Sequence, residues 1–247
     1  MISQACDLCG AALEAPDLSR YADTFLAHVR ADHGDLPFPD DAVRSYGEAL
    51  ARMTGPSERL DTIGAVEVHR VTEERIDDFL DLFDHRVAVG TPQNGGCYCL
   101  EPHECFPDRA PSFGHWTERR AAMVERLRNG STHGYLAYVD GVAAGWCNAS
   151  MRADYNLFKR DDAEDATTVA VSCFAIAPPY RGHGISRLLL ERAIADAPAR
   201  GASAIEAYPL NEGIGFSGFR GWRPMYDGAG FAEVAVRARD TVVRRPV

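Results

Sequence analysis

The sequence from Val169 to Leu190 reads VAVSCFAIAPPYRGHGISRLLL, and its two halves follow different patterns. The first half, up to Ala177, is apolar and rich in β-branched residues, which predicts a buried strand. Pro178 and Pro179 end that strand. From Ile185 onward, apolar residues recur at spacings of three and four, which predicts a helix. The expected order is therefore a strand, a turn that contains glycine, and a helix.

The turn itself, Arg181 to Gly184, favours a phosphate ligand. The first turn of a helix carries backbone N–H groups that have no partner inside the helix. The helix dipole adds partial positive charge there, and glycines let a ligand approach the backbone closely. The chain has no G-x-x-x-x-G-K-[ST] pattern and no G-x-G-x-x-G at its start, so two common nucleotide motifs are excluded.

Residues Arg181 to Ser186 resemble the pyrophosphate loop of the GNAT superfamily of acyl-CoA N-acyltransferases. That pattern is Gln or Arg, two residues, Gly, one residue, then Gly or Ala; here Arg181, Gly184 and Ser186 hold the three positions, with a small serine at the last. An ordinary strand–turn–helix is the alternative. The resemblance implies acetyl-CoA as cosubstrate, with its pyrophosphate bound by Arg181, Gly182, His183, Gly184, Ile185 and Ser186.

Composition limits the classes of protein that remain. The chain has 247 residues, of which 46% are hydrophobic, enough for one full core and a small accessory module. Its net charge of −10 disfavours nucleic acid and anionic membranes as partners. We find no apolar run long enough to span a membrane and no signal peptide. Seven cysteines in such a chain indicate reduced thiols and metal ligands, so we expect a cytoplasmic protein.

Residues 1–40 carry the pattern of a small zinc module. Cys6 and Cys9 form a C-x2-C pair, and His28 and His33 lie at the end of a predicted helix, a donor set that suits tetrahedral zinc. The stretch resembles a Cys2His2 zinc finger and implies a structural zinc ion. Its 18-residue gap between Cys9 and His28 exceeds the usual gap of about 12. The alternative is four unrelated residues in a flexible arm.

The charge of this module argues against DNA binding. Residues 1–40 hold seven acidic residues and two arginines, the wrong balance for contact with phosphates. We therefore expect a structural or docking element. Residues 41–63 are interpreted as a helical connector, and residues 64–247 as the catalytic domain.

The order of elements in residues 64–247 also resembles the GNAT superfamily. It implies an α/β (α+β) fold with a mixed central sheet flanked by helices. The expected elements are a strand at Ala65–Val71, a helix from Thr72, a long loop at Thr91–Pro111, a helix at Pro111–Arg128, a hairpin at Tyr135–Ser150, the motif strand and helix, a strand at Ala202–Tyr208, a short helix around Met225–Phe231, and two strands at Val234–Arg239 and Thr241–Arg245.

The long loop contains Cys97, Cys99, His103 and Cys105. Their spacing, C-x-C-x3-H-x-C, matches no established zinc module. We expect a tight hairpin with its thiols packed inward, and a second metal site is the alternative.

The resemblance also implies how the substrates are held. The motif strand and the next strand splay apart, and the pantetheine arm of CoA binds the exposed strand edge through the main chain of Phe174 and Ile176. The amine then attacks the thioester directly. Tyr226 matches the tyrosine that protonates the departing thiolate. Its alternative is a core tyrosine with its hydroxyl at the surface.

The general base is expected at Glu206, on the strand after the motif helix, with Glu164 and Asp165 as further candidates. A solvent-facing carboxylate without a role in catalysis is the equal alternative for Glu206. The acidic stretch from Asp161 to Asp165 is read either as a solvated loop or as a surface that attracts a cation.

These observations predict an acetyl-CoA-dependent N-acetyltransferase whose acceptor is a primary amine, a small cationic molecule of the aminoglycoside or polyamine kind. One alternative is a protein N-acetyltransferase whose zinc finger recruits the target. Another is an inactive CoA-binding module. No nucleic acid or membrane partner is expected, and a homodimer is left open.

Overall fold

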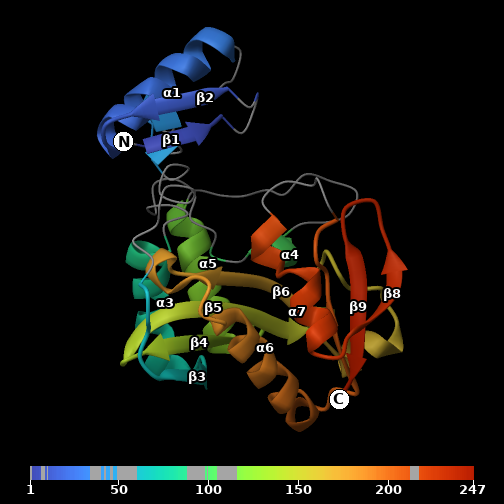
Figure 1. Ribbon diagram of the computed structural model, residues 1–247. Coiled ribbons are helices and arrows are strands. Elements are labelled where there is room, and N and C mark those ends of the chain that lie inside the picture. The colour runs from blue at the N-terminus through green and yellow to red at the C-terminus, as the bar shows by residue number, and fades with distance from the viewer. Residues whose placement is uncertain are drawn as a thin grey trace.

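The computed structural model describes residues 2–6, 9, 11–33, 40–41, 43–44, 47–48, 60–87, 98, 100–104, 116–211 and 217–247. The chain forms a small N-terminal unit with a two-stranded sheet and a larger unit built on a seven-stranded sheet (Figure 1). Each unit has its own apolar core. All statements below concern these residues.

The N-terminal unit is a hairpin followed by a helix. Strands β1 (Ile2–Ala5) and β2 (Ala12–Ala15) pair antiparallel, and α1 (Leu18–Asp32) packs against them. Asp17 caps the helix, since its carboxylate accepts the N–H of Arg20 at 2.9 Å. The unit's core is small, as the sequence predicts, and consists of Cys6, Ala15, Tyr21, Phe25, Val29 and Val43. The last of these lies in the connector, whose described residues are helical between Asp41 and Glu48 but not from Leu60 to Ile63.

The large sheet is mixed, which confirms the predicted fold class. Its strand order is β3-β4-β5-β6-β7-β9-β8; β6 and β7 run parallel, and the other neighbouring pairs run antiparallel. The strands are β3 (Val66–Arg70), β4 (Gly134–Val139), β5 (Val142–Met151), β6 (Thr168–Ile176), β7 (Ala204–Ala207), β8 (Ala232–Val236) and β9 (Thr241–Pro246).

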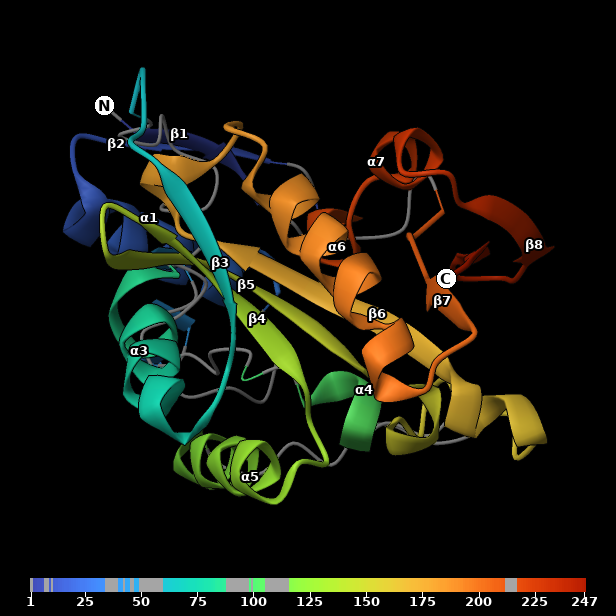
Figure 2. The same cartoon turned by 90° about the horizontal axis from the view of Figure 1, so that it is seen from below.

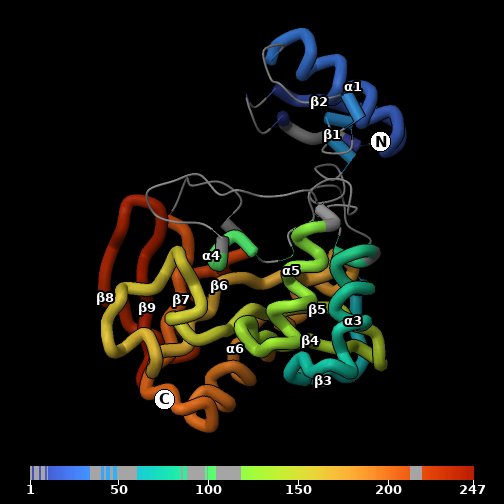
Figure 3. Tube along the Cα trace, turned by 180° about the vertical axis from the view of Figure 1, so that it is seen from behind, coloured from blue at the N-terminus to red at the C-terminus, as the bar shows by residue number. Residues whose placement is uncertain are grey.

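Helices cover both faces of this sheet. The helix α6 lies on one face, and α3 and α5 lie on the other (Figures 2 and 3). Strand alternation explains this, because along β4 Ala137 packs in the core under α6 whereas Leu136 packs in the core under α3 and α5. The helices are α3 (Ile76–Asp81), α4 (Glu101–Glu104), α5 (Trp116–Asn129), α6 (Ile185–Asp196) and α7 (Arg223–Gly228). Shorter helical turns include 3-10 turns at Glu73–Arg75, Arg152–Asp154, Ala163–Thr167, Pro178–Tyr180, Pro198–Arg200 and Ser217–Arg220, and a π turn at Leu82–Arg86.

The predicted hairpin between β4 and β5 is confirmed. Asp140 and Gly141 both have positive φ angles, 50° and 79°, as the central residues of a type I′ turn require. This turn matches the twist of the two strands and therefore fixes their register.

In the long loop, the expected hairpin is wrong where the structure describes it. Residues Glu101–Glu104 form the short helix α4, and Cys97, Cys99 and Cys105 lie outside the described residues. His103 is fully buried. Its Nδ1 is 2.9 Å from the carbonyl oxygen of Asp154, and its Nε2 is 3.1 Å from Oγ1 of Thr132. Nδ1 thus holds α4 to the 3-10 turn after β5, and Nε2 holds it to the chain just before β4, so His103 is structural.

The burial of His103 predicts a loss of stability in mild acid. Burial lowers the pKa of His103 to about 4, whereas the unfolded chain titrates at 6.5. Below pH 6.5 the unfolded state binds a proton that the folded state does not bind. The free energy of unfolding therefore decreases as the pH is lowered. The loss is about 2 kcal/mol at pH 5. Urea unfolding at pH 7 and pH 5 measures it.

The matched variants for that measurement are His103→Gln and His69→Gln. The first should reduce the difference between pH 7 and pH 5 by about 2 kcal/mol. The second removes a partly exposed histidine on β3 and should leave the difference unchanged. An NMR titration in which the His103 ring protonates above pH 6 would contradict the account.

A candidate coenzyme A site and a candidate zinc centre

The turn after β6 has the backbone conformation that the sequence predicts. The strand ends at Ile176, Pro178–Tyr180 form a 3-10 turn, and α6 begins at Ile185. Gly182 and Gly184 both have a φ angle of 78°, in the left-handed region that favours glycine. Gly184 is the N-cap of α6, and neither glycine carries a side chain to shield the amides. The two glycines are solvent-exposed.

Five consecutive backbone amides in this turn are available to bind an anion. The N–H groups of Arg187 and Leu188 donate to the carbonyl oxygen of Gly184 at 3.0 and 3.2 Å. The N–H groups from Gly182 to Ser186 have no acceptor among the described residues. Together with the dipole of the 12-residue helix α6, they make a site suited to a phosphate or pyrophosphate group.

Strand β6 has an open edge next to the turn. Its pairing with β7 ends at Val171 and Ala207, although β6 continues to Ile176. The N–H of Ala177 donates to Ala144 on the β5 side, so by strand alternation the backbones of Phe174 and Ile176 face away from β5. This is the open edge that the sequence analysis assigned to these two residues.

Part of that edge is already used within the protein. Nε of Arg181 donates to the carbonyl oxygen of Ile176 at 3.0 Å, which ties the turn to the end of the strand. Within the described part of the chain, the N–H of Ile176 and both backbone groups of Phe174 have no hydrogen-bond partner, although the 3-10 turn Ser217–Arg220 packs beside β6. Burial lowers the pKa of Arg181, in keeping with its position under the turn.

Tyr226, the expected general acid, lies in the core beneath this region. Its side chain is fully buried on α7, and its hydroxyl donates to the carbonyl oxygen of Arg220 at 2.6 Å. Burial raises the pKa of Tyr226 well above its usual value, so the hydroxyl stays protonated. The side chain lies in the core, as in the alternative, but its hydroxyl is buried and not at the surface. Its catalytic role stays a prediction.

Glu206, the expected general base, is the centre of a buried ion-pair network. One carboxylate oxygen lies 3.2 Å from Nη1 of Arg152, and the other lies 2.9 Å from Nη2 of Arg160. The hydroxyl of Tyr208 donates to it at 2.9 Å, and Arg244 lies 3.4 Å away. The side chain is fully buried, not solvent-facing. Four donors occupy the carboxylate, which argues against its assignment as a base and gives it a structural role.

Three residues of the acidic stretch belong to the same ion-pair network. Asp162 and Asp165 lie 2.7 and 2.5 Å from the buried guanidinium of Arg152, and Glu164 lies 2.6 Å from Arg244. Burial alone would raise the pKa of Asp165, but the hydrogen bonds from Arg152 and from the backbone N–H groups of Arg160 and Asp162, together with the charge of Arg152, outweigh it and the pKa is lowered. The carboxylates therefore neutralise the protein's own arginines. Asp161, Asp162 and Glu164 are exposed, as expected for a solvated loop, and only Asp165 of these four residues is buried.

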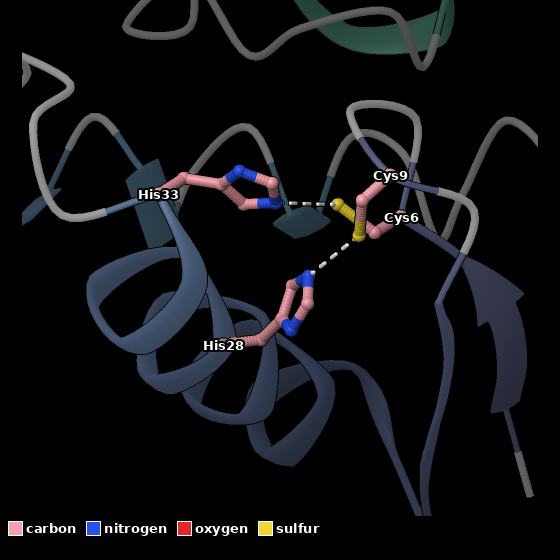
Figure 4. A group of neighbouring side chains, drawn as sticks. All are labelled: Cys6, Cys9, His28 and His33. Carbon is pink, nitrogen blue, oxygen red and sulfur yellow. Dashed lines mark hydrogen bonds between the residues drawn. The ribbon is translucent and has the colours of Figure 1, made fainter.

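The four predicted zinc ligands meet in the N-terminal unit (Figure 4). The ligand atoms of Cys6, Cys9, His28 and His33 all lie within 4.8 Å of one another. Sγ of Cys9 is 3.3 Å from Nε2 of His28, and Sγ of Cys6 is 3.8 Å from Nε2 of His33. Ligands at about 2.0–2.3 Å around a tetrahedral ion are separated by about 3.3–3.8 Å, so the cluster fits zinc.

Helix α1 explains how two histidines five positions apart reach one point. His28 lies on the last turns of the helix, whereas His33 is its C-cap, where the chain leaves the helix with φ −136°. Nδ1 of His28 is 2.7 Å from the carboxylate of Asp32, which turns Nε2 toward the sulfurs. A carboxylate behind a histidine is a common arrangement around protein-bound metals.

A comparison with protein families matches the part of the chain that contains this turn. Residues 99–214 match the family model of the acetyltransferase (GNAT) family, so the chain contains a GNAT acetyltransferase domain. The match covers the turn, β4 to β7 and α6.

Three solved structures illustrate the similarity of fold. A Salmonella typhimurium protein with its cofactor acetyl-CoA shares 16% identity, over 74% of this chain and 94% of its own, with a TM-score of 0.46. An N-acetyltransferase from Staphylococcus aureus shares 15% over 74% and 99%, with a TM-score of 0.46. The ribosomal-protein-S18-alanine N-acetyltransferase from Escherichia coli shares 12% over 74% and 94%, with a TM-score of 0.43.

No curated protein matches the chain. In the described part of the chain, none of the helices has the length and apolar character needed to cross a membrane.

Proposed function

We propose that this protein is an acetyl-CoA-dependent N-acetyltransferase that transfers an acetyl group to a primary amine. The observation that carries the proposal is the run of five amides without acceptors, Gly182 to Ser186, at the start of α6 and within the matched family domain. These amides would bind the pyrophosphate, and the open edge at Phe174 and Ile176 would bind the pantetheine arm.

The reaction that this arrangement supports is direct transfer. The amine nitrogen attacks the thioester carbonyl carbon, the new C–N bond forms, and the C–S bond breaks. The amine must lose a proton, and the departing thiolate must gain one. The chain's contribution is to hold the thioester on the edge of β6 while the pyrophosphate anchors it at α6.

Tyr226 is the residue we propose to protonate the thiolate. Its raised pKa keeps a proton on the hydroxyl at neutral pH. That proton is directed at the carbonyl oxygen of Arg220, so the hydroxyl must rotate to deliver it. We assign no residue as the base, because Glu206 and Asp165 are held in ion pairs with Arg152.

The acceptor is proposed to be a small amine. The paired carboxylates from Asp162 to Asp165 lend no support to the cationic acceptor expected from the sequence. An amine on a protein is the second candidate for the acceptor. The observation that favours this candidate is the separate N-terminal unit with its own core, because such a unit can dock a target protein.

The functional test is release of free thiol from acetyl-CoA in the presence of a panel of amines, with the acetylated product identified by mass spectrometry. The panel includes an aminoglycoside, a polyamine, free amino acids and a peptide with a free N-terminus. Thiol release with one class of amine identifies the acceptor. Tight CoA binding without turnover on any amine would instead make the domain an inactive CoA-binding module.

We also propose that Cys6, Cys9, His28 and His33 hold one structural zinc ion. A bound zinc ion would supply a cross-link between the β1–β2 hairpin and α1, a unit whose apolar core is small. Asp32 would orient His28 from behind.

The purified protein should contain about one zinc per chain by elemental analysis. The double variant Cys6→Ala, Cys9→Ala should lose it, because two thiolates are removed from the cluster. Asp32→Asn should weaken zinc binding by about 10-fold or more, measured by chelator competition. Cys173→Ala removes a thiol on β6 and should keep the metal. Full zinc retention in the double variant would contradict the assignment.

A further inference from the structure

The backbone of Leu60, a residue that precedes β3, contacts two residues at the phosphate-binding turn. The N–H of Leu60 donates to the carbonyl oxygen of Pro179 at 2.9 Å. Nε2 of His183 is 2.8 Å from the carbonyl oxygen of Leu60, so the imidazole donates to it. Both contacts are made by backbone atoms of Leu60, and the residue itself is 42% exposed.

The two partners of Leu60 lie on either side of Gly182, the first glycine of the turn. Pro179 is in the 3-10 turn that precedes Arg181, and His183 stands between Gly182 and Gly184. Glycines have a large conformational entropy in the absence of constraints, and ordering them on ligand binding costs affinity. A bridge from Pro179 to His183 removes part of that freedom before any ligand arrives.

We propose that the Leu60 backbone and the His183 imidazole form a clamp that holds the turn in its phosphate-binding conformation. Both are positioning residues in this role: His183 acts by fixing the amides of its neighbours, not by contact with phosphate. The inference rests on the proposed CoA site. It also extends the working domain upstream, because Leu60 precedes the expected start at Gly64 and lies well before the matched residues 99–214.

The clamp predicts the CoA affinity of three variants of the full chain. Leu60→Pro removes the N–H that binds Pro179, and His183→Ala removes the donor to Leu60. Each should raise the Kd for CoA about 5-fold, measured by calorimetry. His183→Gln can donate an amide N–H to the same carbonyl and should recover most of the affinity. Thr62→Pro is the matched control, because it places proline at an exposed residue whose N–H makes no hydrogen bond to a described residue.

The double variant Leu60→Pro, His183→Ala separates a clamp from direct contact with phosphate. If both changes break one bridge, the double variant binds CoA about as well as the weaker single variant. If His183 contacts the phosphate itself, the two effects multiply and the inference is overturned. Parent-like CoA affinity in Leu60→Pro also overturns it.

A second readout does not depend on CoA. In the ligand-free protein, the amides of Gly182 to Ile185 should exchange hydrogen faster in Leu60→Pro and His183→Ala than in the parent or in Thr62→Pro. Unchanged exchange in these variants refutes the clamp, whether or not the parent protein binds CoA. Failure of the parent protein to bind CoA would by itself reject only the proposed function.

Discussion

Replacing Gly184 by aspartate should weaken CoA binding by about 100-fold or more. The substitution places a carboxylate at the N-cap of α6, beside the amides that are proposed to bind the pyrophosphate. Two like charges at hydrogen-bond distance repel strongly, and the aspartate can also accept the amides that the ligand needs. A Cβ at this position would meet no atom within 4 Å, so the loss comes from charge and not from a clash.

Gly184→Asn is the control that isolates the charge. Asparagine has nearly the same shape as aspartate and tolerates a positive φ angle as well, which matters because Gly184 has φ 78°. The asparagine variant should lose less than about 10-fold in affinity. Calorimetry with CoA gives both values. Equal affinities for the two variants would show that no anion binds at this turn.

Replacing Arg152 by methionine should destabilise the protein by about 3–5 kcal/mol, the cost of breaking a buried ion pair from one side. The Arg152 side chain is fully buried and lies between Asp165 and Glu206, at 2.5 and 3.2 Å. Methionine occupies the space of the arginine side chain, but the buried carboxylates of Asp165 and Glu206 lose the guanidinium with which they pair. Urea unfolding followed by circular dichroism measures the change.

Arg187→Met is the matched control, since Arg187 is 70% exposed and pairs with Glu191 on the surface of α6. Its effect should stay within about 0.5 kcal/mol. Adding Glu206→Gln and Asp165→Asn to Arg152→Met should recover part of the lost stability, because the two buried side chains that faced Arg152 are then uncharged. A loss below about 1 kcal/mol in Arg152→Met would mean that solvent reaches the network.

The elements of the sheet unit could be predicted because their signals are local. The change of period between Val169 and Leu190 marks β6 and α6, and Asp140-Gly141 marks a two-residue hairpin turn. The meeting of Cys6, Cys9, His28 and His33 could be predicted for the same reason, since a C-x2-C pair and two histidines at a helix end keep their spacing in any context. The 5-residue separation of His28 and His33 works because the helix ends at Asp32.

The roles of single charged residues could not be predicted in this way. Glu206 on a strand end looks accessible in the sequence, but its partners Arg152 and Arg244 lie 54 and 38 residues away along the chain. The buried state of Tyr226 depends on the chain around Arg220 and on Phe231, which packs against it. Leu60 carries no sequence signal at all, because its contacts to the turn use backbone atoms.

The most direct test of the account is amide hydrogen exchange, resolved by residue, with and without CoA. The account predicts that CoA slows exchange at the five amides from Gly182 to Ser186, and at Phe174 and Ile176 on the open edge of β6. CoA that binds while leaving exchange at these amides unchanged would contradict the proposed site.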